Sequence, residues 1–132
     1  MHIDHIGIAV SDLEKAIETY EKILNTRCFK RERVKSEKVE TAFFQTGESK
    51  VELLGATESD SVIAKYVEKK GQGLHHVAFE VEDIHSELKR LKNEGFNLLN
   101  EQPKEGADHK LVAFLHPKDN EGVLVELCQT KP

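Results

Sequence analysis

The stretch DHIGIAVSDL at residues 4–13 decides the fold, because it returns 71 residues later as HHVAFEVEDI at residues 75–84. After a three-residue insertion the offset becomes 74, and it places Val51-Glu52-Leu53 on Val125-Glu126-Leu127. The chain therefore contains two copies of one module. Each copy carries a histidine near its start and a glutamate near its end.

Length and composition restrict what the chain can be. Its 132 residues fit one domain, and a module of about 60 residues would be marginal alone, so we expect both copies to share one core. The chain has a net charge of −5 and so lacks the excess of basic residues that is typical of nucleic-acid-binding proteins. No apolar run approaches the roughly 18 residues of a membrane span. Cys28 and Cys128 do not have the spacing of a metal site or a disulfide framework. No targeting segment is visible, so we expect a cytoplasmic protein.

Apolar periodicity predicts the order βαβββ in each module. A capping box at residues 11–14 starts the first helix. In the first module, 1–56, we expect strand 2–10, a helix from residue 13, a strand within 27–38 and strands 39–45 and 50–54. In the linker, 57–72, we expect a helix at 60–70. In the second module, 73–132, we expect strand 74–81, helix 83–93 and strands 96–101, 110–116 and 122–129. We therefore predict an α+β single domain, 1–132, whose two modules form a curved, cleft-bearing mixed sheet with helices outside.

The repeated histidine and glutamate predict a metal site formed by His5, Glu52, His76 and Glu126. In each of the four strands the side chain in question points away from the bulky apolar residues. A lone strand histidine is usually structural or exposed, but recurrence on the same face in both copies favours a ligand. Two imidazoles and two carboxylates without a thiolate suit one harder divalent ion, and we expect Co²⁺ first, then Mn²⁺, Ni²⁺, Zn²⁺ or Mg²⁺.

Three segments carry a family resemblance: LHHVAFEVEDI at 74–84, FLHPK at 114–118 and GVLVEL at 122–127. With the opening strand they make the chain, over essentially its whole length, similar to methylmalonyl-CoA epimerases. These belong to the vicinal oxygen chelate superfamily, together with glyoxalase I and extradiol dioxygenases. The resemblance implies a homodimer acting on an acyl-CoA thioester. Its reaction would interconvert (2R)- and (2S)-methylmalonyl-CoA by removal and return of the C2 proton, through an enolate that the metal stabilises.

The resemblance also implies roles for individual residues. By position, the family's metal ligands fall on His5, Glu52, His76 and Glu126, and Glu126 also matches a position credited with proton transfer. Epimerisation needs a proton-transfer group on each face of C2. Glu40 falls where some members carry a catalytic glutamate, so it is the second catalytic candidate. A solvated strand glutamate is an equally open interpretation of Glu40.

The alternatives come from the same superfamily. Position 52 is Glu here where some epimerases carry Gln, and the same four-residue ligand set is used by glyoxalase I (lactoylglutathione lyase). The flanking segments favour the epimerase over that alternative. A metal-free binding protein would lack the four ligands, and a dioxygenase would use two histidines and one carboxylate for Fe(II). Lys104, Lys110 and Lys118 are candidate contacts to the phosphates of CoA, and we expect no nucleic-acid or membrane partner.

Overall fold

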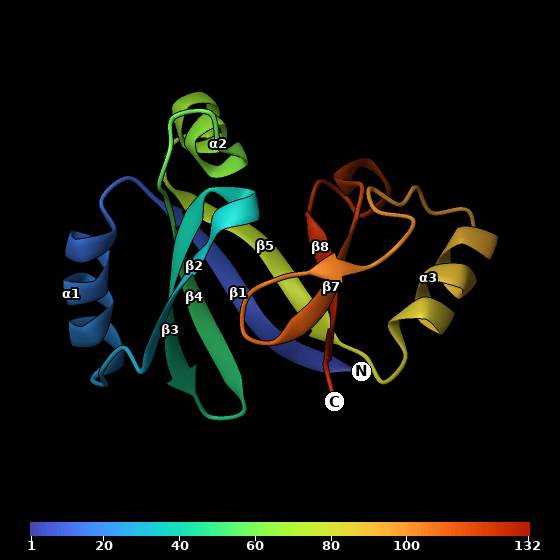
Figure 1. Ribbon diagram of the computed structural model, residues 1–132, viewed down its shortest axis with the longest axis horizontal. Helices are drawn as coiled ribbons and strands as arrows, with labels where there is room; N and C mark the ends of the chain where they lie inside the picture. The colour runs from blue at the N-terminus through green and yellow to red at the C-terminus, as the bar shows by residue number, and fades with distance from the viewer. The chain divides into compact units, whose positions relative to one another are not determined.

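The computed structural model describes all residues, 1–132, and divides the chain into two compact units (Figure 1). The N-terminal unit comprises residues 5–75, and the C-terminal unit comprises residues 1–4 and 76–132. Strand β1 (His2–Val10) therefore begins in the C-terminal unit and continues in the N-terminal one. The single-domain organisation expected from the sequence stays a prediction.

The N-terminal unit is a mixed sheet with two helices. Its remaining elements are α1 (Leu13–Leu24), β2 (Lys30–Val34), the 3₁₀ turn η1 (Lys35–Glu37), β3 (Val39–Thr46), β4 (Ser49–Ala56) and α2 (Val62–Lys70). The strand order is β2-β3-β4-β1; β1 runs parallel to β4, and the other neighbours are antiparallel. Parallel pairing of β1 with β4 requires a long connection, and α1, β2 and β3 provide it.

The C-terminal unit repeats this arrangement. Its elements are β5 (Gly73–Glu80), which starts in the other unit, α3 (Ile84–Asn93), β6 (Lys104–Glu105), β7 (Lys110–Leu115), the 3₁₀ turn η2 (Pro117–Asp119) and β8 (Val125–Thr130). The order is β5-β8-β7-β6, and β5 runs parallel to β8. The predicted βαβββ order is thus confirmed in both copies.

One predicted strand, 96–101, is wrong. Only an isolated bridge from Leu98 to Leu115 forms there, and the short β6 takes the edge of the sheet instead. Two backbone hydrogen bonds flank this bridge, from Leu99 N–H to the Phe114 carbonyl at 2.8 Å and from His116 N–H to the Asn97 carbonyl at 2.9 Å. Side chains take neighbouring backbone donors: the Asn100 Oδ1 atom accepts the Phe114 N–H at 2.9 Å, and Asp119 accepts the Asn97 N–H at 2.8 Å.

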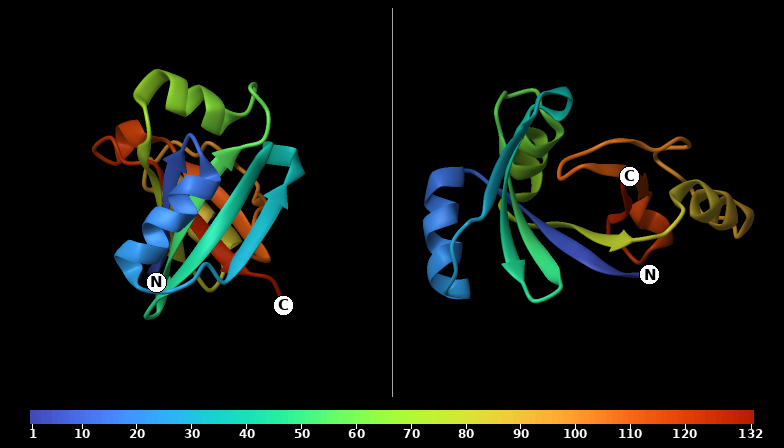
Figure 2. Two further views of the ribbon diagram at one scale, coloured as in Figure 1. Left: turned by 90° about the vertical axis from the view of Figure 1, so that its left-hand side faces the viewer. Right: turned by 60° about the horizontal axis from the view of Figure 1, so that its bottom comes forward.

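Helix α1 packs flat against β3 and β4, as the views in Figure 2 show. Asp12 caps the helix by accepting the Lys15 N–H at 3.2 Å. A cluster around the buried Ile17 and Leu53 fills the interface, and Gly55 permits the close approach, since a Cβ there would lie 3.0 Å from Leu13 Cβ. The face of β3 and β4 opposite α1 is the one that carries Glu52.

Helix α3 has the equivalent position in the C-terminal unit. Its buried residues Ile84, Leu88 and Leu91 pack on Ala113 and Leu127 of the strands. Burying such aliphatic side chains contributes about 1.5–3 kcal/mol each. The apolar cluster beneath α3 covers one face of the strands in this unit, and His76 and Glu126 lie on the other face. None of the helices has the length and apolar character that a transmembrane segment requires.

Candidate metal and proton-transfer site

In the N-terminal unit, His5 and Glu52 form a buried pair. His5 comes from β1 and Glu52 from β4, and the parallel register sets Gly7 beside Glu52, so alternation puts His5 and Glu52 on one face. The His5 Nε2 atom lies 3.4 Å from Glu52 Oε1, and each side chain is 7% exposed.

In the C-terminal unit, His76 and Glu126 form the equivalent pair. The register of β5 and β8 sets Ala78 beside Glu126, which repeats the relation of Gly7 to Glu52. The His76 Nε2 atom lies 3.3 Å from Glu126 Oε1, and the two side chains are 4% and 7% exposed. The repeat thus preserves side-chain geometry as well as residue type.

Both pairs fit ligation of a divalent ion. Metal–nitrogen and metal–oxygen bonds of about 2.0–2.2 Å at angles between 90° and tetrahedral put two ligand atoms about 2.8–3.6 Å apart. The distances of 3.4 Å and 3.3 Å lie within this span. Burial of an imidazole beside a carboxylate is also what a ligand pair requires, because buried ionisable groups need a partner.

Phe114 supports the orientation of His76. Its ring stands edge-on to the imidazole, with the centroids 5.9 Å apart and an interplanar angle of 86°. Phe114 lies opposite Glu126 in the β7–β8 register, so the three side chains share one face of the unit. This contact was not predicted from the sequence. The repeat contained a signal for it, because Phe114 is the equivalent of Phe43, which lies opposite Glu52.

Glu40 lies elsewhere. The β3–β4 register pairs Phe43 with Glu52 and Glu40 with Gly55, so Glu40 is on the opposite face from Glu52. Its Oε2 atom accepts a 2.9 Å hydrogen bond from Arg31 Nε, and the same guanidinium binds Glu14 of α1. The two carboxylates raise the pKa of Arg31 above its already high ordinary value, with Glu14 the larger cause. The structure therefore does not bring Glu40 together with Glu52.

A charged cluster, which we name the Lys110 cluster, comprises the buried Lys110 and Asp4, the half-buried Glu80 and the exposed Thr130. The Lys110 ammonium donates to Glu80 Oε1 at 2.5 Å, Thr130 Oγ1 at 2.7 Å and Asp4 Oδ1 at 3.4 Å. Thr130 in turn donates to Glu80 through its hydroxyl at 3.1 Å and its N–H at 3.0 Å. The lysine side chain is 8% exposed, so its three donors are used here and not on a CoA phosphate as the sequence suggested.

The two acids keep this lysine charged. Burial by itself would lower the pKa of Lys110, but the hydrogen bond to Glu80 and the charges of Asp4 and Glu80 outweigh it and raise the pKa. The cluster is therefore an ammonium ion between two carboxylates. The sequence repeat marks these positions as unusual, because the first copy has the apolar Ala9 and Val39 where the second copy has the charged Glu80 and Lys110.

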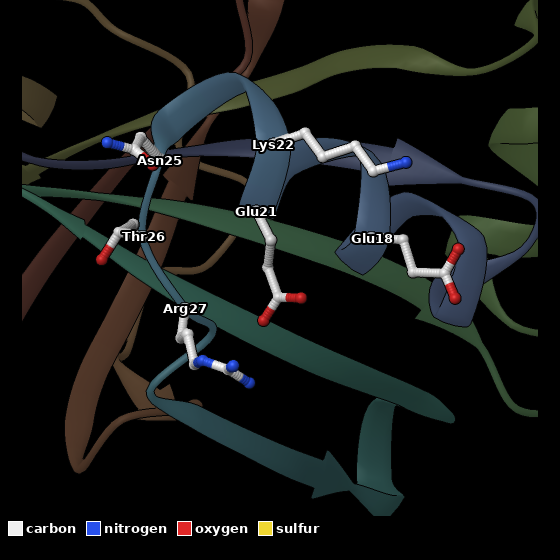
Figure 3. A pocket seen from close by; sticks show the side chains of 6 residues that line it. All are labelled: Glu18, Glu21, Lys22, Asn25, Thr26 and Arg27. Atoms are coloured by element: carbon white, nitrogen blue, oxygen red, sulfur yellow. The ribbon is translucent and has the colours of Figure 1, made fainter.

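A separate hollow lies at the C-terminal end of α1 (Figure 3). Its lining is Glu18, Glu21, Lys22, Asn25, Thr26 and Arg27. Glu21 is already engaged, because its Oε2 atom accepts the Cys28 N–H at 3.1 Å. None of the four predicted ligands lines this hollow, and its mixed surface charges do not converge on one point. We assign it no role in the site.

Comparison with known proteins identifies the family of the chain. Residues 4–114 match the model of the glyoxalase/bleomycin resistance protein/dioxygenase superfamily. The mitochondrial methylmalonyl-CoA epimerase of Homo sapiens is 41% identical over 128 residues, which cover 96% of this chain and 73% of that protein. The crystal structure of methylmalonyl-CoA epimerase from Mycobacterium tuberculosis superposes with a TM-score of 0.93 at 33% identity, covering 99% of this chain and 89% of that one.

Two further similarities bear on the alternatives. A solved methylmalonyl-CoA epimerase in complex with methylmalonyl-CoA and NH₄⁺ superposes with a TM-score of 0.91 at 34% identity, covering 98% of this chain and 94% of that one. The lactoylglutathione lyase of Neisseria meningitidis is only 24% identical over 138 residues, which cover 99% of this chain and 92% of that protein. These findings confirm the predicted fold class and the resemblance. The chain belongs to the methylmalonyl-CoA epimerases, enzymes of the glyoxalase/bleomycin resistance protein/dioxygenase superfamily.

Proposed function

We propose that the protein is a metal-dependent epimerase that interconverts (2R)- and (2S)-methylmalonyl-CoA, with His5, Glu52, His76 and Glu126 as ligands of one divalent ion, Co²⁺ first among the ions considered. The observation that carries the proposal is the repeated His–Glu pair, at 3.4 Å in one unit and 3.3 Å in the other. Family membership supports the reaction, because the relatives that match most of the chain are named for it.

The substrate's chemistry explains what these residues must do. The C2 proton is acidic because its carbanion is delocalised into the thioester carbonyl, and a bound cation would stabilise that developing enolate charge. Glu126 is the proposed proton acceptor and donor on one face of C2. Its burial beside His76 excludes bulk water from the carboxylate, and Phe114 limits the imidazole's rotation.

A second proton-transfer group is needed for the other face of C2. Glu40 was predicted for this role, and that assignment stays a prediction which the structure does not support. Its carboxylate is bound to Arg31 and lies on the face of β3 that α1 covers. Glu126 is therefore the one of the two predicted catalytic residues that we propose here.

Glyoxalase I remains the second candidate function, because its ligand set is the same. The higher identity to epimerases, 41% against 24%, argues for the epimerase. An acyl-CoA substrate agrees with exposed lysines such as Lys104, while Lys110 is no longer a candidate phosphate contact. The homodimer and the cytoplasmic location stay predictions, and the two free cysteines agree with a reducing compartment.

One experiment tests the proposed reaction directly. Metal-loaded protein is mixed with methylmalonyl-CoA of one C2 configuration in D₂O, and NMR follows deuterium entry at C2 together with loss of optical purity. Metal-stripped protein and a sample without enzyme correct for spontaneous exchange. Rapid metal-dependent exchange with epimerisation is expected. No exchange above the blank, with metal demonstrably bound, would contradict the epimerase, and turnover of the methylglyoxal–glutathione hemithioacetal would then be measured.

A further inference from the structure

The Lys110 cluster has no counterpart in the N-terminal unit, although the surrounding backbone is repeated. The offsets of 71 and 74 place Lys110 on Val39 and Thr130 on Ala56. The two pairs have the same cross-strand relation, because Val39 lies opposite Ala56 just as Lys110 lies opposite Thr130. The fold therefore accepts apolar side chains at these positions.

The apolar version is a packed cluster. In the N-terminal unit, Val39 packs with Ala9, Leu54 and Ile63, all of them buried. Replacing a buried ion pair by well-packed apolar residues is often neutral or stabilising, so a buried lysine between two acids is not explained by stability alone. The best-attested role of such buried charges is to specify how segments are positioned.

The segment that the cluster positions is the start of β1. Residues 1–4 belong to the C-terminal unit while the rest of β1 belongs to the N-terminal unit, and Asp4 is the last residue before this division. Its carboxylate binds Lys110 at 3.4 Å, and both side chains are less than a tenth exposed. His5 follows directly, with its Cα about 3.8 Å from that of Asp4.

The cluster also joins the strands that carry the second His–Glu pair. Glu80 lies four residues after His76 on the same face of β5, and Thr130 lies four residues after Glu126 on the same face of β8. The bonds from Thr130 to Glu80 therefore link the ends of both strands. A one-residue slip would move His76 or Glu126 to the wrong face, and these bonds oppose it.

We propose that Lys110 is a positioning residue which, through its ion pair with Asp4, holds the start of β1 in the C-terminal unit and thereby orders the part of the strand from which His5 follows. This proposal rests on the proposed function, because it assumes that His5 is a metal ligand. Lys110 does not itself contact a ligand. Its effect is on the affinity for the metal, as for outer residues that orient ligands in other metal sites.

The test uses two variants and a matched control. Asp4→Asn keeps the size of the side chain but removes the charge that faces Lys110, and the ring of bonds among Lys110, Glu80 and Thr130 remains. Lys110→Met removes the ammonium. The control is Asp60→Asn, which breaks a surface ion pair with Lys38 in the other unit. Full-length metal-free proteins are titrated with Co²⁺ by calorimetry, and hydrogen exchange of residues 2–8 is measured by mass spectrometry without metal.

We expect Asp4→Asn and Lys110→Met to raise the Kd for Co²⁺ by about tenfold or more. Both variants should also speed exchange in residues 2–8, whereas Asp60→Asn should change neither quantity. A wild-type Kd in Asp4→Asn, with a normal unfolding transition, would overturn the proposal, and so would an equal loss in the control. If Lys110→Met does not fold, Asp4→Asn decides alone. If wild-type protein binds no Co²⁺, the proposed metal site fails, but unchanged exchange in Asp4→Asn would still overturn the role of Lys110.

Discussion

The His76 Nε2 atom lies 3.3 Å from Oε1 of Glu126, and both side chains are buried on one face of the C-terminal unit. Replacing Glu126 by Gln keeps the side chain's shape but removes its capacity to accept the C2 proton. We expect Glu126→Gln to lower turnover by about 10²–10⁴-fold, the usual contribution of a positioned acid–base group. Deuterium entry at C2 measures the loss, and an unchanged unfolding temperature shows that the fold is intact. Turnover within threefold of wild type would exclude Glu126 as the base.

The two histidines should contribute to one metal site. We expect His5→Ala and His76→Ala each to weaken Co²⁺ binding and to abolish turnover at a metal concentration that saturates the wild type. Elemental analysis of the wild type should give one ion per chain. His2→Ala is the matched control, because His2 is exposed at the start of the same strand as His5. Two independent ions per chain would contradict a shared site and would indicate one for each His–Glu pair.

For Glu40 we predict that substitution has little effect on turnover, in contrast to Glu126. Because Arg31 binds its carboxylate on the face of β3 opposite Glu52, we expect Glu40→Gln to leave turnover within about threefold of wild type. Deuterium exchange at C2 and epimerisation should both be measured from each C2 configuration, since a second base would remove the proton from only one of the two epimers. Loss of epimerisation in both directions, with deuterium exchange retained for only one epimer and no change in the unfolding temperature, would restore Glu40 as the second proton-transfer group.

The two thiols should differ in reactivity. Burial raises the pKa of Cys128, and the nearby carboxylates of Glu126, Asp4 and Glu80 raise it further, so little thiolate forms at neutral pH. Cys28 is partly exposed. We expect an aromatic disulfide reagent to modify Cys28 alone in the folded protein and both cysteines after denaturation. Rapid modification of two thiols in the folded state would contradict this expectation, and Cys28→Ser assigns the signal.

Asp83 should make stability depend on pH in acid. Hydrogen bonds from the Ser86 hydroxyl at 2.8 Å and backbone N–H at 3.2 Å hold the pKa of Asp83 below its ordinary value. A lowered pKa in the folded state stabilises the protein above the unfolded pKa of about 4, and this stabilisation is lost as the pH falls through the lowered value. The difference in unfolding temperature between wild type and Asp83→Ala should therefore shrink on acidification. A difference independent of pH would contradict a role for the charge.

The sequence predicted most of the fold because two signals agreed: the repeat and the apolar periodicity. It placed α1, α3 and the paired strands within a few residues of their observed limits. It failed at 96–101, where Asn97 and Asn100 use side-chain bonds that no periodicity reveals. The N-terminal boundary of β8 was also too early, at 122, because Gly122 has a φ of 86° and ends a turn before the strand begins.

The site was predictable only as far as the repeat extends. Alternation along β3 puts Glu40 on the same face as Ala42 and Phe44, but whether Glu52 shares that face depends on the β3–β4 register, which the sequence does not contain. Lys110 was predicted as a candidate CoA contact, and its burial could not be predicted because it depends on acids that are distant in the chain. Asp4 is 106 residues away from it.

During folding, two similar halves of one chain can exchange places, and tandem repeats are prone to such misassembly. Here the copies differ where exchange would matter, since Val39 requires an apolar neighbour and Lys110 requires an acid. If the opening strand took the place of β5, Ala9 would stand where Glu80 stands, and the ammonium would lose its closest partner. The divergence of the duplicated halves thus disfavours such an exchange, even though each half keeps a His–Glu pair of nearly the same geometry.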